Sequence, residues 1–272
     1  MNLQKNQILS VRIAETNMLG FGVVKIDGVV IFVQNAVEED FCKIKIIKRA
    51  KNYCVARIEE LIEPSSKRIE PTCLHFRRCG GCSFQHVSYE YEKQLKLKSV
   101  EGFLLKEGLK DVAVLPVLST GNTENYRNKA QFPVSLDENG DVICGFYANK
   151  THKVCRLDSC SIQNSRFNTI AKCVCSFLTE NRIPPYNEET QNGLVRHIYL
   201  RAAEQTGQIM LCLVLSTDEF HLKEEFISVL TKKFPEITSI CLNIQPENTN
   251  VILGNKMIYL FGPKKNHGSL LR

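Results

Sequence analysis

The sequence lacks several features that would define its class directly. No apolar run approaches the roughly 20 residues of a membrane-spanning helix, and no internal repeat or low-complexity segment is present. The first residues, Met1-Asn2-Leu3-Gln4-Lys5, do not open a signal-peptide pattern. These absences argue against a helical membrane protein and against a repeat architecture. We therefore expect a cytoplasmic protein without a membrane partner.

The composition is that of an ordinary soluble globular protein, with 43% hydrophobic and 24% charged residues, and 272 residues allow about two domains. The twelve cysteines could suggest a disulfide framework, but in a cytosolic chain of this size most should be reduced. Several lie in apolar runs, where cysteine is commonly buried: Cys42, Cys54, Cys173, Cys175, Cys212 and Cys241. A net charge of +6 and a pI near 8.7 favour a polyanionic partner.

Three cysteines lie within residues 73–82, and the last two, Cys79 and Cys82, enclose a pair of glycines, Gly80-Gly81. Two thiolates at this spacing can bind one metal only if the backbone between them turns tightly, and glycine permits the positive φ and close approach that this needs. A tetrathiolate site requires a fourth ligand, for which Cys160 is our candidate. A cluster held in this way would join two distant segments of the chain.

Zinc is the main alternative to an iron–sulfur cluster, because His75 or His86 could complete a Cys₃His site. Three reduced thiols without a metal are a further alternative, although the glycine pair would then have no obvious purpose. The Cys-x3-Cys-x2-Cys pattern of radical S-adenosylmethionine enzymes is absent, because five residues separate the first two cysteines. A [4Fe–4S] cluster with four cysteine ligands has no open iron, so we expect it to have a structural or sensing role.

The first 63 residues read as five short strands separated by glycine and other turn residues, over residues 8–13, 20–26, 29–33, 41–48 and 53–62. Five short antiparallel strands in about 60 residues indicate a small closed barrel of the OB type. Basic residues cluster on the fourth strand and the loop after it: Lys43, Lys45, Lys48, Arg49 and Lys51. This cluster is either a solvated edge that discourages strand pairing or a surface that faces nucleic-acid phosphates, and charge alone favours neither.

After a linker at residues 64–68, helices and hairpins alternate, which is typical of an α+β domain. The pattern predicts helices over residues 88–106, 165–181 and 219–234. It predicts strands over residues 129–136, 142–147, 152–157, 194–203, 208–216, 237–244 and 256–261. The expected fold is therefore multi-domain, with a five-stranded OB-like β-barrel at 1–63, an α+β domain carrying the cysteine-ligated cluster at 64–262, and a divergent tail at 263–272.

An ordered set of motifs resembles the RNA (uracil-5-)-methyltransferases, and the resemblance extends from the N-terminus to about Gly262. The motifs are Cys73-x5-Cys79-Gly-Gly-Cys82-x2-Gln85-His86, Tyr89-x4-Gln94-Leu95-x2-Lys98, Tyr126-Arg127-Asn128-Lys129-Ala130-Gln131-Phe132, Gly145-Phe146-Tyr147, Cys160-x-Ile162-Gln163, Leu194-Val195-Arg196-His197 and Thr249-Asn250-Val251-Ile252-Leu253-Gly254. The branch with the greatest resemblance methylates uridine in 23S ribosomal RNA.

The resemblance implies that the barrel is a TRAM domain, an OB-like module that binds RNA. It implies a [4Fe–4S] cluster, whose ligands would be Cys73, Cys79, Cys82 and Cys160. It favours RNA over DNA as the partner, ribosomal RNA above all, and so favours phosphate contacts for the basic residues Lys43, Lys45, Lys48 and Arg49.

In the second domain we expect Arg127 and Lys129 to contact the RNA, because arginine can bind phosphate bidentately or stack on a base and lysine supplies a point charge. Tyr126 or Phe146 could stack on an unpaired base, with burial in the core as the alternative for each. His152 has a weaker claim to the substrate, with an ordinary strand position as its alternative.

The family has a further Rossmann-like domain that binds S-adenosylmethionine, and this chain lacks the strand, glycine-rich turn and helix of such a site. The family's cysteine nucleophile lies in a Pro-Pro-Arg context and adds to C6 of uracil so that C5 can take the methyl group. The only Pro-Pro here is Pro184-Pro185, followed by Tyr186. We therefore expect no catalytic and no S-adenosylmethionine-binding residue, and we expect the cofactor to act only with a separately supplied catalytic domain.

Two hypotheses follow for the function. In the first, the chain is a truncated family member, inactive alone, whose family function is 23S rRNA uracil-C5 methylation. In the second, it is a non-catalytic RNA-binding protein that contains a [4Fe–4S] cluster or zinc. A split enzyme, with its catalytic domain on another polypeptide, is a third arrangement.

Overall fold

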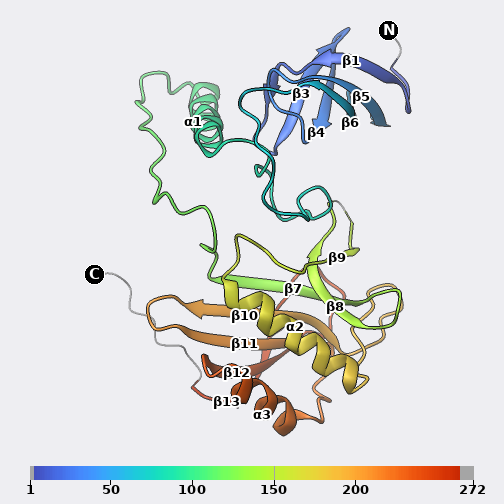
Figure 1. Cartoon of the computed structure of the whole chain (residues 1–272), viewed down its shortest axis with the longest axis vertical. Helices are drawn as coiled ribbons and strands as arrows, with labels where there is room; N and C mark the ends of the chain where they lie inside the picture. The colour runs from blue at the N-terminus through green and yellow to red at the C-terminus, as the bar shows by residue number, and fades with distance from the viewer. Residues whose placement is uncertain (1–2, 150, 264–272) are drawn as a thin grey trace. The chain divides into compact units, whose positions relative to one another are not determined.

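The structure is a computed structural model that describes residues 3–149 and 151–263 (Figure 1). The chain divides into two units: one comprises Met1–Arg77 and Cys82–Thr120, the other Arg78–Gly81 and Gly121–Arg272. The chain thus passes from one unit to the other and back within the cysteine loop. None of the described helices is long and apolar enough to cross a membrane.

The first unit contains a six-stranded sheet with the order β1-β5-β6-β4-β3-β2. Its strands are β1 (Ile8–Arg12), β2 (Glu15–Thr16), β3 (Phe21–Ile26), β4 (Val29–Gln34), β5 (Phe41–Arg49) and β6 (Tyr53–Glu63). All five predicted strands form, but the expected count of five is corrected to six by the short strand β2. The expectation that every pair is antiparallel is also wrong, because β4 and β6 pair in parallel. The chain reverses between β4 and β5, so the return strand β6 runs in the direction of β4.

The two edge strands of this sheet, β1 and β2, are separated only by Ile13 and Ala14. The Ile13 N–H donates to the Asp40 carbonyl at 2.9 Å, and the Ala14 N–H donates to the Val23 carbonyl in β3 at 3.0 Å. Residues 13 and 14 therefore connect the two edge strands and form hydrogen bonds toward both edges of the sheet. This connection curls the sheet. Alternate residues of β5, among them Ile44, point into the enclosed core and are fully buried.

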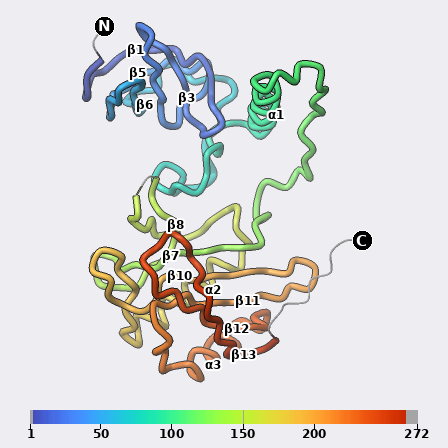
Figure 2. Tube along the Cα trace, turned by 180° about the vertical axis from the view of Figure 1, so that it is seen from behind, coloured from blue at the N-terminus to red at the C-terminus, as the bar shows by residue number. Residues whose placement is uncertain are grey.

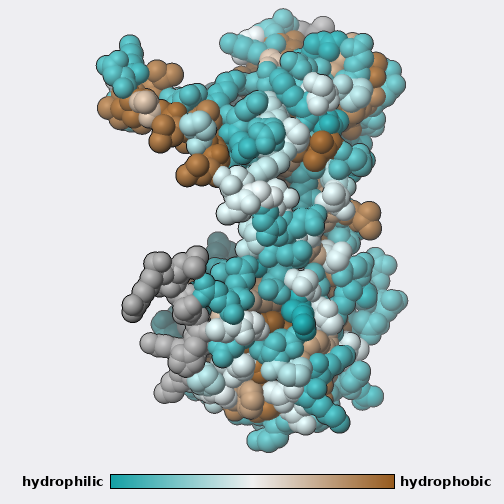
Figure 3. All heavy atoms as spheres, turned by 60° about the vertical axis from the view of Figure 1, so that its left-hand side comes forward, coloured by the Kyte–Doolittle hydropathy of each residue, from teal (hydrophilic) through white to brown (hydrophobic). Residues whose placement is uncertain are grey.

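Helix α1 (Tyr89–Lys106) also belongs to the first unit. The Ser88 hydroxyl caps the helix by accepting the Tyr91 N–H at 3.3 Å. Tyr91 and Leu95 then pack against Val37, and the Tyr91 hydroxyl donates to the carboxylate of Glu38. The later turns of the helix expose apolar side chains (Figure 3), and their largest members are Val100, Phe103 and Leu105.

The second unit is built on a seven-stranded sheet with the order β13-β12-β11-β10-β7-β8-β9. Its strands are β7 (Lys129–Leu136), β8 (Val142–Tyr147), β9 (Val154–Arg156), β10 (Val195–Ala203), β11 (Gln208–Leu215), β12 (Ile237–Ile244) and β13 (Lys256–Phe261). Its helices are α2 (Ser165–Glu180) and α3 (Lys223–Lys233). Every predicted helix and strand of this region forms. The predicted tail at 263–272 lies outside the described residues apart from Pro263.

The two faces of this sheet are covered differently. On one face, α2 and α3 pack Phe167 and Phe226 onto Phe132 and its neighbours, which form the main core (Figure 1). On the other face, the loop between β12 and β13 crosses the strands, as Figure 2 shows from behind, and Ile252 of this loop packs on a smaller cluster around Tyr199. The second face is only partly covered, and the candidate site lies on this side of β10.

Candidate functional site

A cavity of about 690 Å³ opens in the second unit. Its walls come from the end of β7, the turn between β8 and β9, residues 186–189, the start of β10, and Asn248. The pairing of β10 with β11 shifts register between Val195 and His197. Such a bulge re-aims side chains, which allows the consecutive residues Arg196 and His197 both to line the cavity.

Arg196 is 5% exposed, and the groups that it contacts by hydrogen bonds and stacking are uncharged. Its Nη1 donates to the main-chain carbonyls of Gln245 at 3.2 Å and Glu247 at 3.0 Å. Its guanidinium lies over the ring of Tyr186, 4.3 Å from the centroid. Among the described residues no carboxylate forms an ion pair with it, so a buried positive charge borders the cavity without a countercharge in contact. The two hydrogen bonds of Arg196 connect the loop after β12 to the start of β10.

His197 is 7% exposed, and its Nδ1 is buried without a hydrogen-bond partner in the part of the chain that the structure describes. Burial, aided by the positive charge of Arg196, lowers the pKa of His197 to about 4. The imidazole is therefore neutral at pH 7, with one N–H donor and one lone-pair acceptor. A buried imidazole nitrogen without a partner is a group that a ligand could satisfy.

Glu188 holds two rings at the wall of the cavity. One of its carboxylate oxygens lies 2.6 Å from Nδ1 of His152, and the other lies 3.5 Å from the Tyr147 hydroxyl. The two rings are 5.2 Å apart between centroids. Burial and the neighbouring Glu188 raise the pKa of Tyr147 to about 12, so its hydroxyl stays protonated. His152, a weak candidate from the sequence, thus lies in the wall of the site.

The cysteine loop borders this region through its middle residues. Cys79 forms an isolated bridge with Ala148, and the Gly80 N–H donates to the Tyr147 carbonyl at 3.0 Å. A Cβ on Gly80 would lie 2.9 Å from that same oxygen, so the backbone of Gly80 approaches the end of β8 closely. Neither glycine of the pair uses the positive φ that glycine permits, although both lie in a turn, as the spacing of the cysteines predicts.

Two cysteine sulfurs of the loop receive hydrogen-bond donors. The Gly81 N–H points at Sγ of Cys79 at 3.4 Å, and Nε2 of Gln85 points at Sγ of Cys82 at 3.6 Å. Such donors suit metal-bound thiolates. Across residues 3–149 and 151–263, however, no three His, Cys, Asp or Glu side chains are grouped to hold a metal. The ligand set stays a prediction: Cys73 and Cys82 belong to the first unit, Cys79 and Cys160 to the second.

His86 does not support the zinc alternative, because its side chain is buried in the first unit. Its ring stacks on Phe76 with centroids 5.3 Å apart, and burial beside Arg68 lowers the pKa of His86 to about 4. This is the packing of a core residue.

The basic residues of β5 lie on the outer side of the first sheet. Lys43 forms an ion pair with Glu60 at 2.7 Å across the pairing of β5 with β6. Arg49, the last residue of β5, donates to the carbonyls of Ala50 and Lys51 in the loop that follows. Part of this charge is therefore engaged locally, while Lys45 and Lys48 extend the outer row. An RNA contact for these residues stays a prediction.

Arg127 and Lys129 are both exposed. The Arg127 N–H donates to the Ile162 carbonyl at 2.9 Å, which places Arg127 beside the segment that follows Cys160. Lys129 pairs with Arg201 across β7 and β10, so the structure adds a third basic residue that the sequence analysis missed. No local signal marks Arg201, since its role depends on strand register.

The two aromatic candidates differ. Tyr126 is 50% exposed, whereas Phe146 packs against Phe132 of the main core with centroids 5.2 Å apart. Phe146 is therefore part of the core, as its alternative interpretation predicted. Of these two aromatic residues, only Tyr126 is available for stacking. The cavity residues Arg196 and His197 appear in the sequence only as part of a family motif, and their shared burial depends on the bulge.

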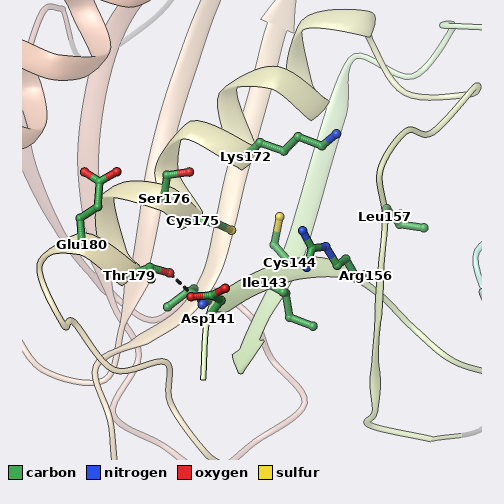
Figure 4. A pocket seen from close by; sticks show the side chains of 11 residues that line it. Asp141, Ile143, Cys144, Arg156, Leu157, Lys172, Cys175, Ser176, Thr179 and Glu180 are labelled. Carbon is green, nitrogen blue, oxygen red and sulfur yellow. Dashed lines mark hydrogen bonds between the residues drawn. The ribbon is translucent and has the colours of Figure 1, made fainter. Parts of the chain in front are cut away.

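A second cavity of about 340 Å³ lies between β8 and α2 (Figure 4). The thiols of Cys144 and Cys175 point toward one another, and Thr179 Oγ1 accepts the Val142 N–H at 2.8 Å. Hydrogen bonding to Cys144, together with burial, raises the pKa of Cys175. This thiol therefore stays protonated and packs as a core residue, as expected from the sequence.

Comparisons with known proteins show what this chain is similar to. No family model matches the chain. A protein of Staphylococcus epidermidis named an uncharacterized RNA methyltransferase is 33% identical over 264 residues, which cover 97% of this chain and 58% of that protein. One of Bacillus cereus with the same description is 38% identical over 261 residues, covering 96% and 56%. The chain thus spans a little over half the length of these curated relatives, and its resemblance to RNA methyltransferases is confirmed at that level.

One solved structure has a similar fold. It is the crystal structure of Pyrococcus abyssi tRNA (uracil-54, C5)-methyltransferase in complex with S-adenosyl-L-homocysteine, with a TM-score of 0.69 and 22% identity. The match covers 96% of this chain and 57% of that protein. The arrangement of sheets and helices described above is therefore one found within an RNA methyltransferase.

Proposed function

We propose that this chain is the RNA-binding part of an S-adenosylmethionine-dependent RNA (uracil-5-)-methyltransferase that acts on 23S ribosomal RNA. The main support is similarity over 97% of the chain to a protein named an RNA methyltransferase, together with a fold like that of a uracil-C5 enzyme. The motifs quoted from the sequence favour the 23S branch. The alternative is a non-catalytic RNA-binding protein with a [4Fe–4S] cluster or zinc.

The RNA-binding surface would have two parts. In the first unit, the curled sheet would serve as an OB-like module of the TRAM type, with Lys45, Lys48 and Arg49 toward phosphates and a weaker share for the ion-paired Lys43. In the second unit, the exposed basic residues would bind the backbone while Tyr126 stacks on an unpaired base. These basic residues are Arg127, Lys129 and Arg201.

S-adenosylmethionine would supply the methyl group that is transferred to C5 of uracil. We assign no catalytic residue and no cofactor-binding residue to this chain, because its sequence has neither the glycine-rich turn nor a cysteine in a Pro-Pro-Arg context. Methyl transfer would therefore rest on residues that the relatives have outside the span they share with this chain. We further propose a [4Fe–4S] cluster on Cys73, Cys79, Cys82 and Cys160, supported by the donors that face two of these sulfurs.

The test of RNA binding is a titration of the protein against a 23S rRNA fragment, a tRNA transcript and duplex DNA at several salt concentrations. Replacing Arg127 and Lys129 by alanine should weaken RNA binding about tenfold and reduce the salt slope by about two, because two phosphate contacts are lost. The matched control replaces Lys232 and Lys233, which are exposed at the end of α3. Equal affinity for DNA, or an unchanged slope in the first variant, would count against the proposal.

A further inference from the structure

We propose that Cys144 and Cys175 form a redox-active dithiol, which reacts with a low-molecular-weight disulfide and closes to a Cys144–Cys175 disulfide. Both thiols are free in the structure, and they come from two elements of the second unit, β8 and α2. Neither residue belongs to the proposed cluster ligands or to the proposed RNA-binding surface. The proposal therefore goes beyond the proposed function and does not depend on it.

One hydrogen bond aligns the two elements that carry these cysteines. Oγ1 of Thr179, near the end of α2, accepts the N–H of Val142, the first residue of β8, at 2.8 Å. Cys175 lies one helical turn before Thr179, and Cys144 lies two strand residues after Val142. Each of these steps is about 6 Å long, so the two cysteines lie opposite one another. Figure 4 shows their thiols pointing toward one another, which is the arrangement that a disulfide requires.

The two sulfurs have different roles in the pair. Cys175 is 7% exposed, and its hydrogen bond to Cys144, together with burial, raises the pKa of its thiol. The protonated thiol of Cys175 is therefore a donor to Cys144, and such a donor stabilises a thiolate. Cys144 is only partly buried. We therefore assign the attack on an incoming disulfide to Cys144 and the second, resolving attack to Cys175.

The cavity of about 340 Å³ beside the pair gives a small molecule access to it. Arg156 and Lys172 line this cavity with both cysteines, and the charge of Arg156 favours the thiolate form of Cys175. Carboxylates near these cations partly offset their charge, and they belong to Asp137, Asp141 and Glu180. Reactive cysteines are typically accessible and lie near cations, whereas cysteines sealed in a core are inert. The pair has both features of a reactive site.

A second pair of facing cysteines in the same unit provides an internal comparison. Cys212 and Cys241 are partners across the parallel strands β11 and β12, and their thiols are also hydrogen-bonded. They are 1% and 0% exposed, so a reagent cannot reach them in the folded protein. Contact between thiols is common to both pairs, and access distinguishes Cys144 and Cys175.

The reaction consists of two thiol–disulfide exchanges. In the first, the thiolate of Cys144 attacks one sulfur of the small disulfide, a mixed disulfide forms, and one small thiolate leaves and takes a proton from water. In the second, Cys175 loses its proton to water and attacks Sγ of Cys144, which expels the second small thiolate. The protein dithiol is oxidised by two electrons, and the small disulfide is reduced to two thiols. The product connects β8 covalently to α2.

The experiment incubates the reduced full chain with glutathione disulfide and maps the tryptic peptides by mass spectrometry. The unmodified protein should link the peptides that carry Cys144 and Cys175. Cys175→Ala cannot complete the second exchange and should accumulate glutathione on Cys144. Cys173→Ala, the same change at a buried position two residues earlier on α2, is the matched control and should form the link. In the reduced unmodified protein, iodoacetamide should label Cys144 roughly tenfold faster than Cys212.

Each other outcome would overturn the proposal. Free thiols at both positions after oxidation would show that the pair is inert. Glutathione on Cys144 without a link in the unmodified protein would show that Cys175 does not resolve the mixed disulfide. A link that survives in Cys175→Ala but not in Cys173→Ala would assign the pairing to Cys173. The labelling rates require no variant, so equal rates for Cys144 and Cys212 would count against the proposal even if Cys175→Ala failed to fold.

Discussion

His86 in the first unit and His197 in the second are both buried as neutral side chains. Burial lowers the pKa of each from an ordinary value of 6.5 to about 4, with a further contribution from the nearby arginine. As the pH falls below 6.5, the unfolded chain takes up a proton at each position, but the folded chain does not until about pH 4. The free energy of unfolding must therefore decrease through this window.

We predict a loss of roughly 3 kcal/mol per buried histidine between the two pKa values. The measurement is urea denaturation at a series of pH values, followed by a probe in each unit. His197→Gln should flatten the acid dependence of the second unit, while His221→Gln, at an exposed position, should leave it unchanged. An acid slope that persists in His197→Gln would show that His197 is not the group responsible.

At the scale of secondary-structure elements, the pairing of the cysteine loop with the end of β8 depends on Gly80. Gly80→Ala would place a methyl group 2.9 Å from the Tyr147 carbonyl and should push Cys79 away from Ala148. We expect a loss of about 1–3 kcal/mol in stability, as for other overpacked sites. Gly81→Ala is the matched control, since its nearest contact would be an ordinary 3.4 Å to Sγ of Cys79. Equal melting temperatures for both variants would contradict this account.

The sequence predicts most elements because local periodicity and turn residues determine them. It places α2 and the strands β7, β8, β10 and β12 within a residue or two of their observed ends. The errors arise where tertiary contacts override the local pattern. Phe220 is predicted to lie in the first turn of a helix, but it lies in the irregular segment before α3, which begins at Lys223, and its side chain is buried in the core. Likewise, neither strand β2 nor the bulge at Arg196 has a local signal.

At the scale of the whole molecule, one unit of the chain extends past residue 63 and includes helix α1, while the domain boundary after residue 63 stays a prediction. Helix α1 belongs with the N-terminal sheet because Tyr91 packs on Val37 and bonds to Glu38. These partners are far apart in sequence, so periodicity cannot reveal them. The same limit applies to the candidate site: a motif can nominate Arg196 and His197, but only the fold shows that residues 186–189 and the β8–β9 turn complete their cavity.

The proposed cysteine ligand set also belongs to this scale, because its four members come from both units. If they hold one [4Fe–4S] cluster, protein purified without oxygen should contain about four irons and absorb near ~400 nm. Cys160→Ser should lose iron as fully as Cys79→Ser, because each removes one of four thiolates. Cys155→Ser is the matched control, a partly buried cysteine on β9 outside the proposed set. One stoichiometric zinc in place of iron would refute the cluster, and full iron in Cys160→Ser would require a different fourth ligand.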